Sequence, residues 1–481
     1  MSSRTDRACV CVSSPEEDDR KAEYGQYPTP APIARFMASL FPASDLTQCR
    51  LLDAGAGTGS LSEAFLEQWR EAGFGYRTVM LDAFEIDAKM RPDLERTLSL
   101  HYDRPGFVPR ILTVDFIEAA VDAITGNLFV ESLPQYTHAI LNPPYKKIRS
   151  SSRHRALLRR AGIETVNLYS AFVALTLELL APGGQLVAII PRSFCNGPYY
   201  KPFRKLILER AAIRRIHLFA ARDKAFKDDG VLQENVIILL ERGGRQGDVV
   251  VSSSTDGSFE DLSLQTHPFH RIVSPSDAEQ CIHVPTSSCQ TLLDLSSALQ
   301  YSLGDVGIRV STGPVVDFRL KTHLRMMPVP GSVPLLYPGH FTDRRAQWPK
   351  PGFKKPNAIM LNGETEKWLY PNGFYTVVRR FTSKEEKRRI VASVVEPHAF
   401  LNMSMLGFEN HLNVFHRDRQ GLPQVLAVGL AAYLNTTALD DYFRRFNGHT
   451  QVNATDLRLL KYPSREMLIA MGEWAMSRDS L

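Results

Sequence analysis

Short apolar runs alternate with amphipathic segments through the first 245 residues of the chain. The runs with the length and composition of buried strands are 50–54, 78–86, 110–114, 138–141, 185–190, 213–219 and 235–240. Segments such as 60–71 and 167–180 have the apolar spacing of helices that cover a sheet. Strands and helices in alternation require right-handed crossovers, which give a largely parallel sheet. The pattern predicts an α/β fold with a mostly parallel, seven-stranded sheet whose last two strands form an antiparallel edge pair.

The chain changes character after residue 245. Residues 246–300 are rich in Ser, Thr, Asp and Pro, which is typical of a linker. Beyond them, Pro-rich loops separate β-like runs such as 374–381, and 425–446 has the pattern of a helix pair. The expected organisation is a flexible N-terminal tail (1–22), an α/β domain (23–245), a linker (246–300) and a C-terminal α+β domain (301–481).

Length and composition are those of a globular protein with two or three domains, since the chain has 481 residues, 44% hydrophobic and 23% charged. No apolar stretch approaches the roughly 18 to 20 residues that span a bilayer, and residues 1–21 lack the apolar core of a signal peptide. The six cysteines form no CxxC pair, so neither a zinc site nor a disulfide framework is expected. These features favour a soluble cytoplasmic protein with no metal and no membrane partner.

Basic residues are concentrated in the C-terminal part of the chain. Residues 301–481 contain 24 Lys and Arg against 16 Asp and Glu, whereas residues 1–300 contain 33 and 36. This excess is weak support for a polyanionic partner, because many basic domains bind nothing acidic.

A glycine-rich turn follows the first predicted strand. Asp53 lies at the end of the strand, and Gly55, Gly57 and Gly59 precede the helix 60–71. Glycines let a ligand approach the backbone, and the free N–H groups of the helix attract a carboxylate or phosphate. The turn contains no Lys, so it is not a P-loop.

Acidic residues also end the next two strands. Glu85, followed by Ile86, is placed to accept both hydroxyl groups of a ribose. Asp115, followed by Phe116, is placed to accept an adenine amino hydrogen while the ring covers the base. Each acid alone would be an ordinary polar strand end. Three of them beside a glycine turn predict a site for a nucleoside without phosphates, with S-adenosylmethionine as the ligand and NAD as the competitor.

The string Asn142-Pro143-Pro144-Tyr145 ends the fourth predicted strand. Two prolines stop the strand and expose the Asn142 side chain and the neighbouring carbonyl groups. The amino group of adenine is a poor nucleophile because its lone pair is delocalised into the ring. Hydrogen bonds to the Asn142 amide oxygen and the Pro143 carbonyl would aim that lone pair at a methyl group, and Tyr145 would stack on the base. A simple strand-ending turn is the alternative interpretation, which the neighbouring glycine turn and acids make less favourable.

With these strings in this order, the sequence resembles the γ-class N6-adenine DNA methyltransferases, PstI-like modification enzymes of type II restriction systems. The resemblance covers most of the chain and begins with the string Tyr-Gly-Gln-Tyr-Pro-Thr-Pro at residues 24–30. It implies a Rossmann-like methyltransferase domain, S-adenosyl-L-methionine as the cofactor and a C-terminal target-recognition domain. The cofactor-binding residues that it implies are Thr29, Asp53, Gly55, Gly57, Gly59, Glu85, Ile86, Asp115, Phe116 and Phe172.

The resemblance also implies contacts to the base and to DNA. It places the flipped adenine between Tyr145 and Phe226, although Phe219 is an alternative, and Phe172 is equally well explained by helix packing. Segments 310–319 and 448–457 resemble recognition segments of the family. The expected DNA-binding residues are Arg444 and Arg445 on phosphates, and Thr450, Gln451 and Asn453 on base edges. A polar loop that caps a helix explains this cluster about equally well.

The sequence therefore predicts a site-specific, adenine-specific DNA methyltransferase that methylates N6 of a flipped adenine in duplex DNA and protects it within a restriction-modification system. Double-stranded DNA is the expected partner, and a cognate restriction endonuclease acting separately stays open. One alternative is an enzyme of the same fold that acts on an RNA adenine or a protein glutamine. Another is a non-catalytic DNA-binding subunit, against which the intact string 142–145 argues.

Overall fold

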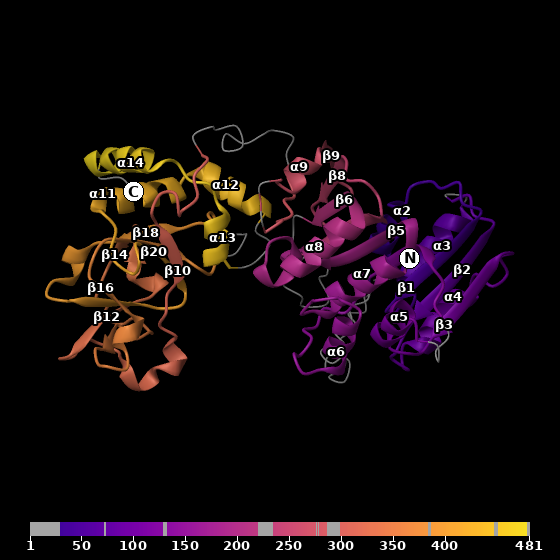
Figure 1. The fold of residues 1–481 in the computed structure, drawn as a ribbon, viewed down its shortest axis with the longest axis horizontal. Coiled ribbons are helices and arrows are strands. Elements are labelled where there is room, and N and C mark those ends of the chain that lie inside the picture. Colours follow the sequence, from indigo (N-terminus) through magenta and orange to yellow (C-terminus); the bar gives the residue numbers. More distant parts are fainter. Residues whose placement is uncertain are drawn as a thin grey trace, which may run out of the picture. The chain divides into compact units, whose positions relative to one another are not determined.

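The computed structural model describes residues 29–71, 74–127, 132–219, 234–275, 277, 279–285, 299–382, 386–446 and 451–478. The chain divides into two units, Met1–Ser288 and Cys289–Leu481, which are described one at a time (Figure 1). The expected flexible tail, 1–22, lies outside the described residues. Across those ranges, no helix is both long and apolar enough to cross a bilayer.

A mixed, mainly parallel sheet forms the centre of the first unit (Figure 1). Among the described residues it has nine strands in the order β3-β2-β1-β4-β5-β7-β6-β8-β9. The strands are β1 (Gln48–Ala54), β2 (Thr78–Phe84), β3 (Phe107–Leu112), β4 (Tyr136–Leu141), β5 (Leu180–Pro191), β6 (Ala211–Phe219), β7 (Asn235–Arg242), β8 (Val249–Ser254) and β9 (Ser263–His267). All seven expected strands are present, and β6 and β7 pair antiparallel as expected.

The prediction of seven strands is wrong at one edge of the sheet, because β8 pairs with β6 and β9 pairs with β8. These two strands come from the segment that the composition assigned to a linker. Ser252 and Ser254 are buried on β8, and their hydroxyl groups lie 3.0 and 3.2 Å from the two ring nitrogens of the buried His217. A buried hydroxyl is tolerated when it has a hydrogen-bond partner. The polar composition therefore concealed a strand whose partner lies elsewhere in the chain.

Helices cover both faces of the first sheet. They are α2 (Ala31–Ser39), α3 (Ser60–Arg70), α4 (Arg91–Ser99), α5 (Phe116–Thr125), α6 (Arg153–Arg160), α7 (Leu168–Leu179), α8 (Lys201–Arg210) and α9 (Phe269–Ile272). Leu51 packs into a core with α2, α3 and α4, whereas its neighbour Leu52 packs into a core with α5, α7 and α8. Successive strand residues point to opposite faces, so two adjacent leucines contribute to two cores. This explains why the strands are continuously apolar.

The second unit contains two further sheets and a helical layer. A six-stranded sheet has the order β10-β20-β17-β18-β14-β13, and a five-stranded sheet has the order β11-β15-β12-β19-β16. The strands are β10 (Arg309–Thr312), β11 (Leu324–Arg325), β12 (Ser332–Leu336), β13 (Phe341–Thr342), β14 (Arg345–Ala346), β15 (Ala358–Met360), β16 (Leu369–Pro371), β17 (Tyr375–Arg379), β18 (Ala392–Val395), β19 (Met405–Phe408) and β20 (Leu412–His416). The helices are α11 (Gln424–Leu434), α12 (Thr437–Phe446), α13 (Ala454–Leu459) and α14 (Arg465–Ser477). The expected helix pair is present as α11 and α12.

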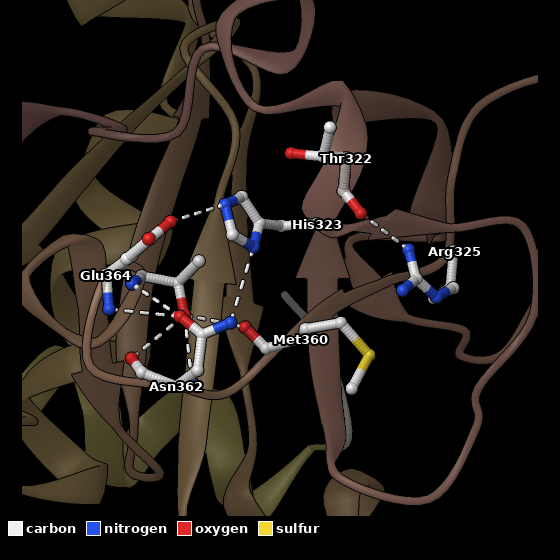
Figure 2. A network of polar contacts seen from close by, with 7 residues as sticks. Thr322, His323, Arg325, Met360, Asn362 and Glu364 are labelled. Carbon is white, nitrogen blue, oxygen red and sulfur yellow. Dashed lines mark hydrogen bonds and ion pairs between the residues drawn. The ribbon is translucent and has the colours of Figure 1, made fainter.

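A polar network in the second unit fixes the turn after β15 (Figure 2). Asn362 Nδ2 lies 3.3 Å from His323 Nδ1, and His323 Nε2 lies 3.0 Å from Glu364 Oε2. The amide can only donate to Nδ1, so the ring proton is on Nε2 and points at the carboxylate. Arg325 donates to the Thr322 carbonyl at 2.9 Å. These groups satisfy one another, so we interpret the network as a loop anchor.

Candidate active site

The strand register brings the predicted polar strand ends to one edge of the first sheet. The last residue of β1, Ala54, is level with Phe84 at the end of β2, and Phe84 is level with Leu112 at the end of β3. The pairing of β1 with β4 places Leu141, the last residue of β4, level with Ala54. In α/β sheets ligands bind at the carboxyl ends of parallel strands. This edge carries the predicted residues Asp53, Glu85, Asp115 and Asn142.

The glycine turn has a backbone that only glycine adopts readily. Gly55, Gly57 and Gly59 have φ values of 82°, 56° and 88°. A Cβ on Gly59 would lie 2.9 Å from Leu94 Cδ1, so this glycine permits close packing of α4. A Cβ on Gly57 would meet nothing within 4 Å. The turn is therefore packed against the protein on one side and open at Gly57.

Glu85 holds the turn in this shape. It is buried, its Oε2 accepts the backbone N–H of Gly57 at 2.8 Å, and its Oε1 accepts that of Asp87 at 2.6 Å. The adjacent Ile86 is 46% exposed, which presents an apolar side chain beside this carboxylate. The structure thus joins the second predicted acid directly to the glycine turn.

Asp53 is fully buried beneath the turn. Its Oδ2 accepts a hydrogen bond from the Ser62 hydroxyl at 2.7 Å, whereas Oδ1 is buried and has no hydrogen-bond partner within the described ranges. Burial raises the pKa of Asp53 to about 7, with a smaller contribution from the charge of Glu85 and a partial offset from the Ser62 hydrogen bond. A carboxyl group with this pKa gains charge most easily when a cation lies beside it.

Asp115 joins β3 to two helices. It caps α5 by accepting the Glu118 backbone N–H at 3.1 Å, and its Oδ2 lies 2.9 Å from Nε2 of His154 on α6. Burial raises the pKa of Asp115, but the hydrogen bond and charge of His154 and the backbone N–H groups outweigh burial, so the pKa is lowered. The same hydrogen bond raises the pKa of His154. Sequence reasoning missed His154, because nothing local links it to a residue 39 positions earlier.

Two aromatic rings stand beside the glycine turn. The ring centroids of Phe116 and Phe172 lie 4.9 Å apart, and Phe172 Cε1 lies 3.7 Å from where a Cβ of Gly55 would be. Both rings are buried in the core shared with α5 and α7. Phe172 therefore packs in the core, which is one of the two interpretations left open by the sequence, and it also borders the glycine turn. Its contact with the cofactor stays a prediction.

The Asn142 side chain is held from two sides. Its Nδ2 donates to Thr29 Oγ1 at 3.0 Å, and the Tyr145 hydroxyl lies 3.1 Å from Asn142 Oδ1. The same hydroxyl lies 3.1 Å from the carbonyl oxygen of Ile189 on β5. A phenol has one proton, so it serves these two oxygens in turn. When the phenol donates to Ile189, Asn142 Oδ1 no longer accepts the Tyr145 proton.

An aromatic cluster packs beside Tyr145. The ring centroid of Tyr145 lies 6.2 Å from that of Tyr169, which lies 5.9 Å from that of Tyr200. The Tyr169 hydroxyl lies 3.2 Å from Ser193 Oγ. Sequence reasoning missed Tyr169, which lies on α7, and Tyr200, which follows β5, as supports.

The other predicted contacts to base and DNA are only partly described. Phe226, Thr450 and the Arg445 side chain lie outside the described residues. The three that are described have partners within the second unit: Arg444 Nε donates to Asp440 Oδ2 at 2.7 Å, Gln451 Oε1 accepts from Arg380 at 3.1 Å, and the Asn453 N–H donates to Asp456 Oδ2 at 2.9 Å. These contacts match the alternative in which the polar residues organise a loop and cap a helix.

Comparison with known proteins gives the following similarities. The family model described as Eco57I restriction-modification methylase matches residues 118–226. The type II methyltransferase M.BsuBI of Bacillus subtilis is 53% identical over 458 residues, which cover 95% of this chain and 91% of that protein. The type II methyltransferase M.PstI of Providencia stuartii is 43% identical over 465 residues, covering 95% and 90%. A solved structure, the ATP-dependent type ISP restriction-modification enzyme LlaBIII bound to DNA, is 12% identical with a TM-score of 0.50 over 94% of this chain and 39% of that chain, which indicates a shared fold.

Proposed function

The chain belongs to the type II DNA methyltransferases of restriction-modification systems, and from that premise we propose that it methylates N6 of adenine in duplex DNA. The observation that carries the proposal is the placement of Asn142 at the sheet edge that also holds the glycine turn, with its amide oriented by Thr29. The amino group of adenine has two hydrogens, and the oxygen atoms at this edge can accept a hydrogen bond from each. The proposal includes a flipped base, since in a duplex one amino hydrogen is held in the base pair and both cannot reach the acceptors of the enzyme.

The residues at the glycine turn fit S-adenosyl-L-methionine as the donor. The open side of Gly57 allows close approach, and the buried Asp53 Oδ1 without a partner in the described structure suits a positively charged group. Glu85, Ile86, Asp115, Phe116 and Phe172 would surround the nucleoside portion. When bound, this cofactor supplies a methyl group on a positively charged sulfur, which makes the carbon electrophilic.

The chain's own residues would prepare the amino group for attack. Asn142 Oδ1 and the Pro143 carbonyl accept one amino hydrogen each, which draws the nitrogen lone pair out of the ring and directs it toward the cofactor side of the edge. Thr29 prevents the amide from turning its nitrogen to the base. The amide is not a base, so the proton that N6 loses after the carbon–nitrogen bond forms passes to water.

Stacking would hold the extruded ring in place. We assign Tyr145 to one face of the base and Phe226 to the other, and Pro144 restricts the backbone of Pro143, whose carbonyl accepts the amino hydrogen, to extended conformations. The edge-on contact of Tyr145 with Tyr169 leaves little freedom for its ring. In the second unit, Arg445 and Thr450 stay proposed DNA contacts. Arg444, Gln451 and Asn453 would have to contact DNA in addition to the partners that they already have within this unit.

Base analysis tests the proposed reaction. Duplex DNA incubated with the protein and methyl-labelled S-adenosyl-L-methionine is expected to contain labelled N6-methyladenine at one recurring sequence. DNA modified beforehand should take up no more label, which is the matched control. Label on the cytosine amino group would contradict the choice of base, and label in RNA or protein but not in DNA would favour the alternative acceptors.

Replacement of Thr29 tests the orientation of the amide. Thr29→Val keeps the shape of the side chain but removes the hydroxyl that Asn142 Nδ2 binds, so kcat should fall by roughly ten- to a hundredfold with little change in KM for the cofactor. Thr29→Ser keeps the hydroxyl and should retain kcat within about threefold. A rise in cofactor KM with kcat intact would instead place Thr29 only in the cofactor pocket.

A further inference from the structure

A basic run follows the Asn142–Tyr145 string directly. Seven Lys and Arg residues occur between positions 146 and 160, and no Asp or Glu occurs among them. They are Lys146, Lys147, Arg149, Arg153, Arg155, Arg159 and Arg160. The first 300 residues as a whole carry fewer basic than acidic residues, 33 against 36, so this run departs from its surroundings.

Part of this charge is used to attach α6 to α5. Three ion pairs join the two helices: His154–Asp115 at 2.9 Å, Arg153–Glu118 at 2.9 Å and Arg160–Asp122 at 2.5 Å. The acids recur along α5 at the spacing of one helix face, and α6 supplies the matching cations. Arg155 lies 3.6 Å from Glu164. These four side chains therefore have a structural explanation.

Three of the four Lys and Arg residues that remain do not. Lys147, Arg149 and Arg159 are exposed and form no ion pair within the parts of the chain that the structure describes. Arg159 lies one helical turn from the like charge of Arg155, although its place in the last turn of α6 is favoured by the helix dipole. These three cations therefore have no internal ion pair, within the described ranges, that would explain them.

The backbone of the run is fixed to the catalytic edge. Leu168 N donates to the Lys146 carbonyl at 2.8 Å, Ile148 N donates to the Val166 carbonyl at 2.8 Å, and Lys147 forms an antiparallel bridge with Asn167. The cations therefore project from an ordered segment. An extended chain spans at most about 3.6 Å per residue, so Lys147 lies within roughly 18 Å of Asn142.

We propose that Lys147 and Arg149 bind the DNA phosphates that flank the target adenine. The inference rests on the proposed function, since it uses the adenine at Asn142 to place the strand. Phosphates follow one another every 3.4 Å of axis along a strand, so several lie within reach of a run that starts next to the base-binding string. The catalytic unit then contributes affinity that does not depend on sequence, separate from base recognition.

Salt-dependent binding measures these contacts. The double variant Lys147→Ala, Arg149→Ala is compared with wild type by fluorescence anisotropy on a labelled duplex, from about 50 to 200 mM salt. Each lost phosphate contact should reduce the slope of log affinity against log salt by about 0.9, hence by about 1.8 for the double variant. The loss should be equal on duplexes with and without the recognition sequence.

Arg77→Ala is the matched control, because Arg77 is exposed just before β2, at the opposite edge of the parallel sheet, and forms no ion pair within the described ranges. Its salt slope should equal that of wild type. Cofactor affinity by calorimetry and the melting temperature should be unchanged in all these variants. An unchanged slope in the double variant, or a loss confined to the duplex with the recognition sequence, would overturn the inference.

The Asn142→Ala variant separates this inference from the proposed function. If it loses methyl transfer while the double variant keeps the wild-type slope, the phosphate contacts are refuted and the proposed chemistry stands. If it keeps methyl transfer, the proposed chemistry is refuted whatever the slopes are.

Discussion

Asn142→Ala is expected to lower the rate of methyl transfer by about a thousandfold, while the affinity for S-adenosyl-L-methionine stays within about threefold. The substitution removes the amide oxygen that would draw the adenine lone pair out of the ring. Asn142 contacts Thr29 and Tyr145 rather than the glycine turn, so cofactor binding should not depend on its side chain. Single-turnover kinetics with saturating DNA measure the rate, and calorimetry measures the affinity.

Asn142→Asp is the informative companion to that variant. It keeps an acceptor oxygen but loses the Nδ2 donor that Thr29 binds, so its rate should lie between those of wild type and Asn142→Ala. In Asn142→Ala the hydrogen bonds to Thr29 and Tyr145 are both lost, which should cost about 1 kcal/mol each, and the melting temperature checks this. A wild-type rate in Asn142→Ala would remove the residue from the chemistry.

Asp53→Asn is expected to stabilise the cofactor-free protein at pH 8 by a few kcal/mol and to weaken cofactor binding by roughly ten- to a hundredfold. The pKa of Asp53 is about 7 in the folded protein against an ordinary value of 3.8. The folded state binds the Asp53 proton more tightly than the unfolded state does. The stability that this proton contributes is therefore full below about pH 3.8 and is lost as the pH rises through about 7. Each pKa unit corresponds to about 1.4 kcal/mol, and an uncharged Asn avoids the cost of a buried charge.

Calorimetric melting at pH 5 and pH 8 tests the stability part, because the gain from Asn should appear at pH 8 and shrink at pH 5. Cofactor titration tests the other part. The wild-type affinity should fall by up to tenfold per unit as the pH drops below about 7, since protonated Asp53 has no charge for the cationic ligand. A pH-independent wild-type affinity, or an Asn variant that binds as well as wild type, would show that Asp53 does not face the cofactor.

The sheet and the polar strand ends could be predicted because their information is local. Continuous apolar runs such as that ending at Leu141 are buried on both faces, and the parallel register then fixes where the following Asn142 lies. The glycine turn is equally local, since its positive φ values require glycine. The contact between Thr29 and Asn142 could not be predicted, because it joins residues 113 positions apart through single side chains.

The rest of the fold was hidden for related reasons. The Ser-rich strand β8 has its hydroxyl partner on β6, so composition alone favoured a linker. In the second unit, β10 pairs with β20, a partner about a hundred residues later, and strands such as β11 have two residues. Strands this short carry no detectable alternation, so only the longer run 374–381 and the helix pair were apparent.

The most direct test of the account is a crystal structure of the protein with a cognate duplex and a cofactor analogue that cannot transfer methyl. We expect one adenine outside the helix, its N6 about 3 Å from Asn142 Oδ1, and the Tyr145 ring parallel to the base. An adenine that stays stacked in the duplex, or a base bound away from Asn142 while its amide contacts only Thr29 and Tyr145, would contradict it.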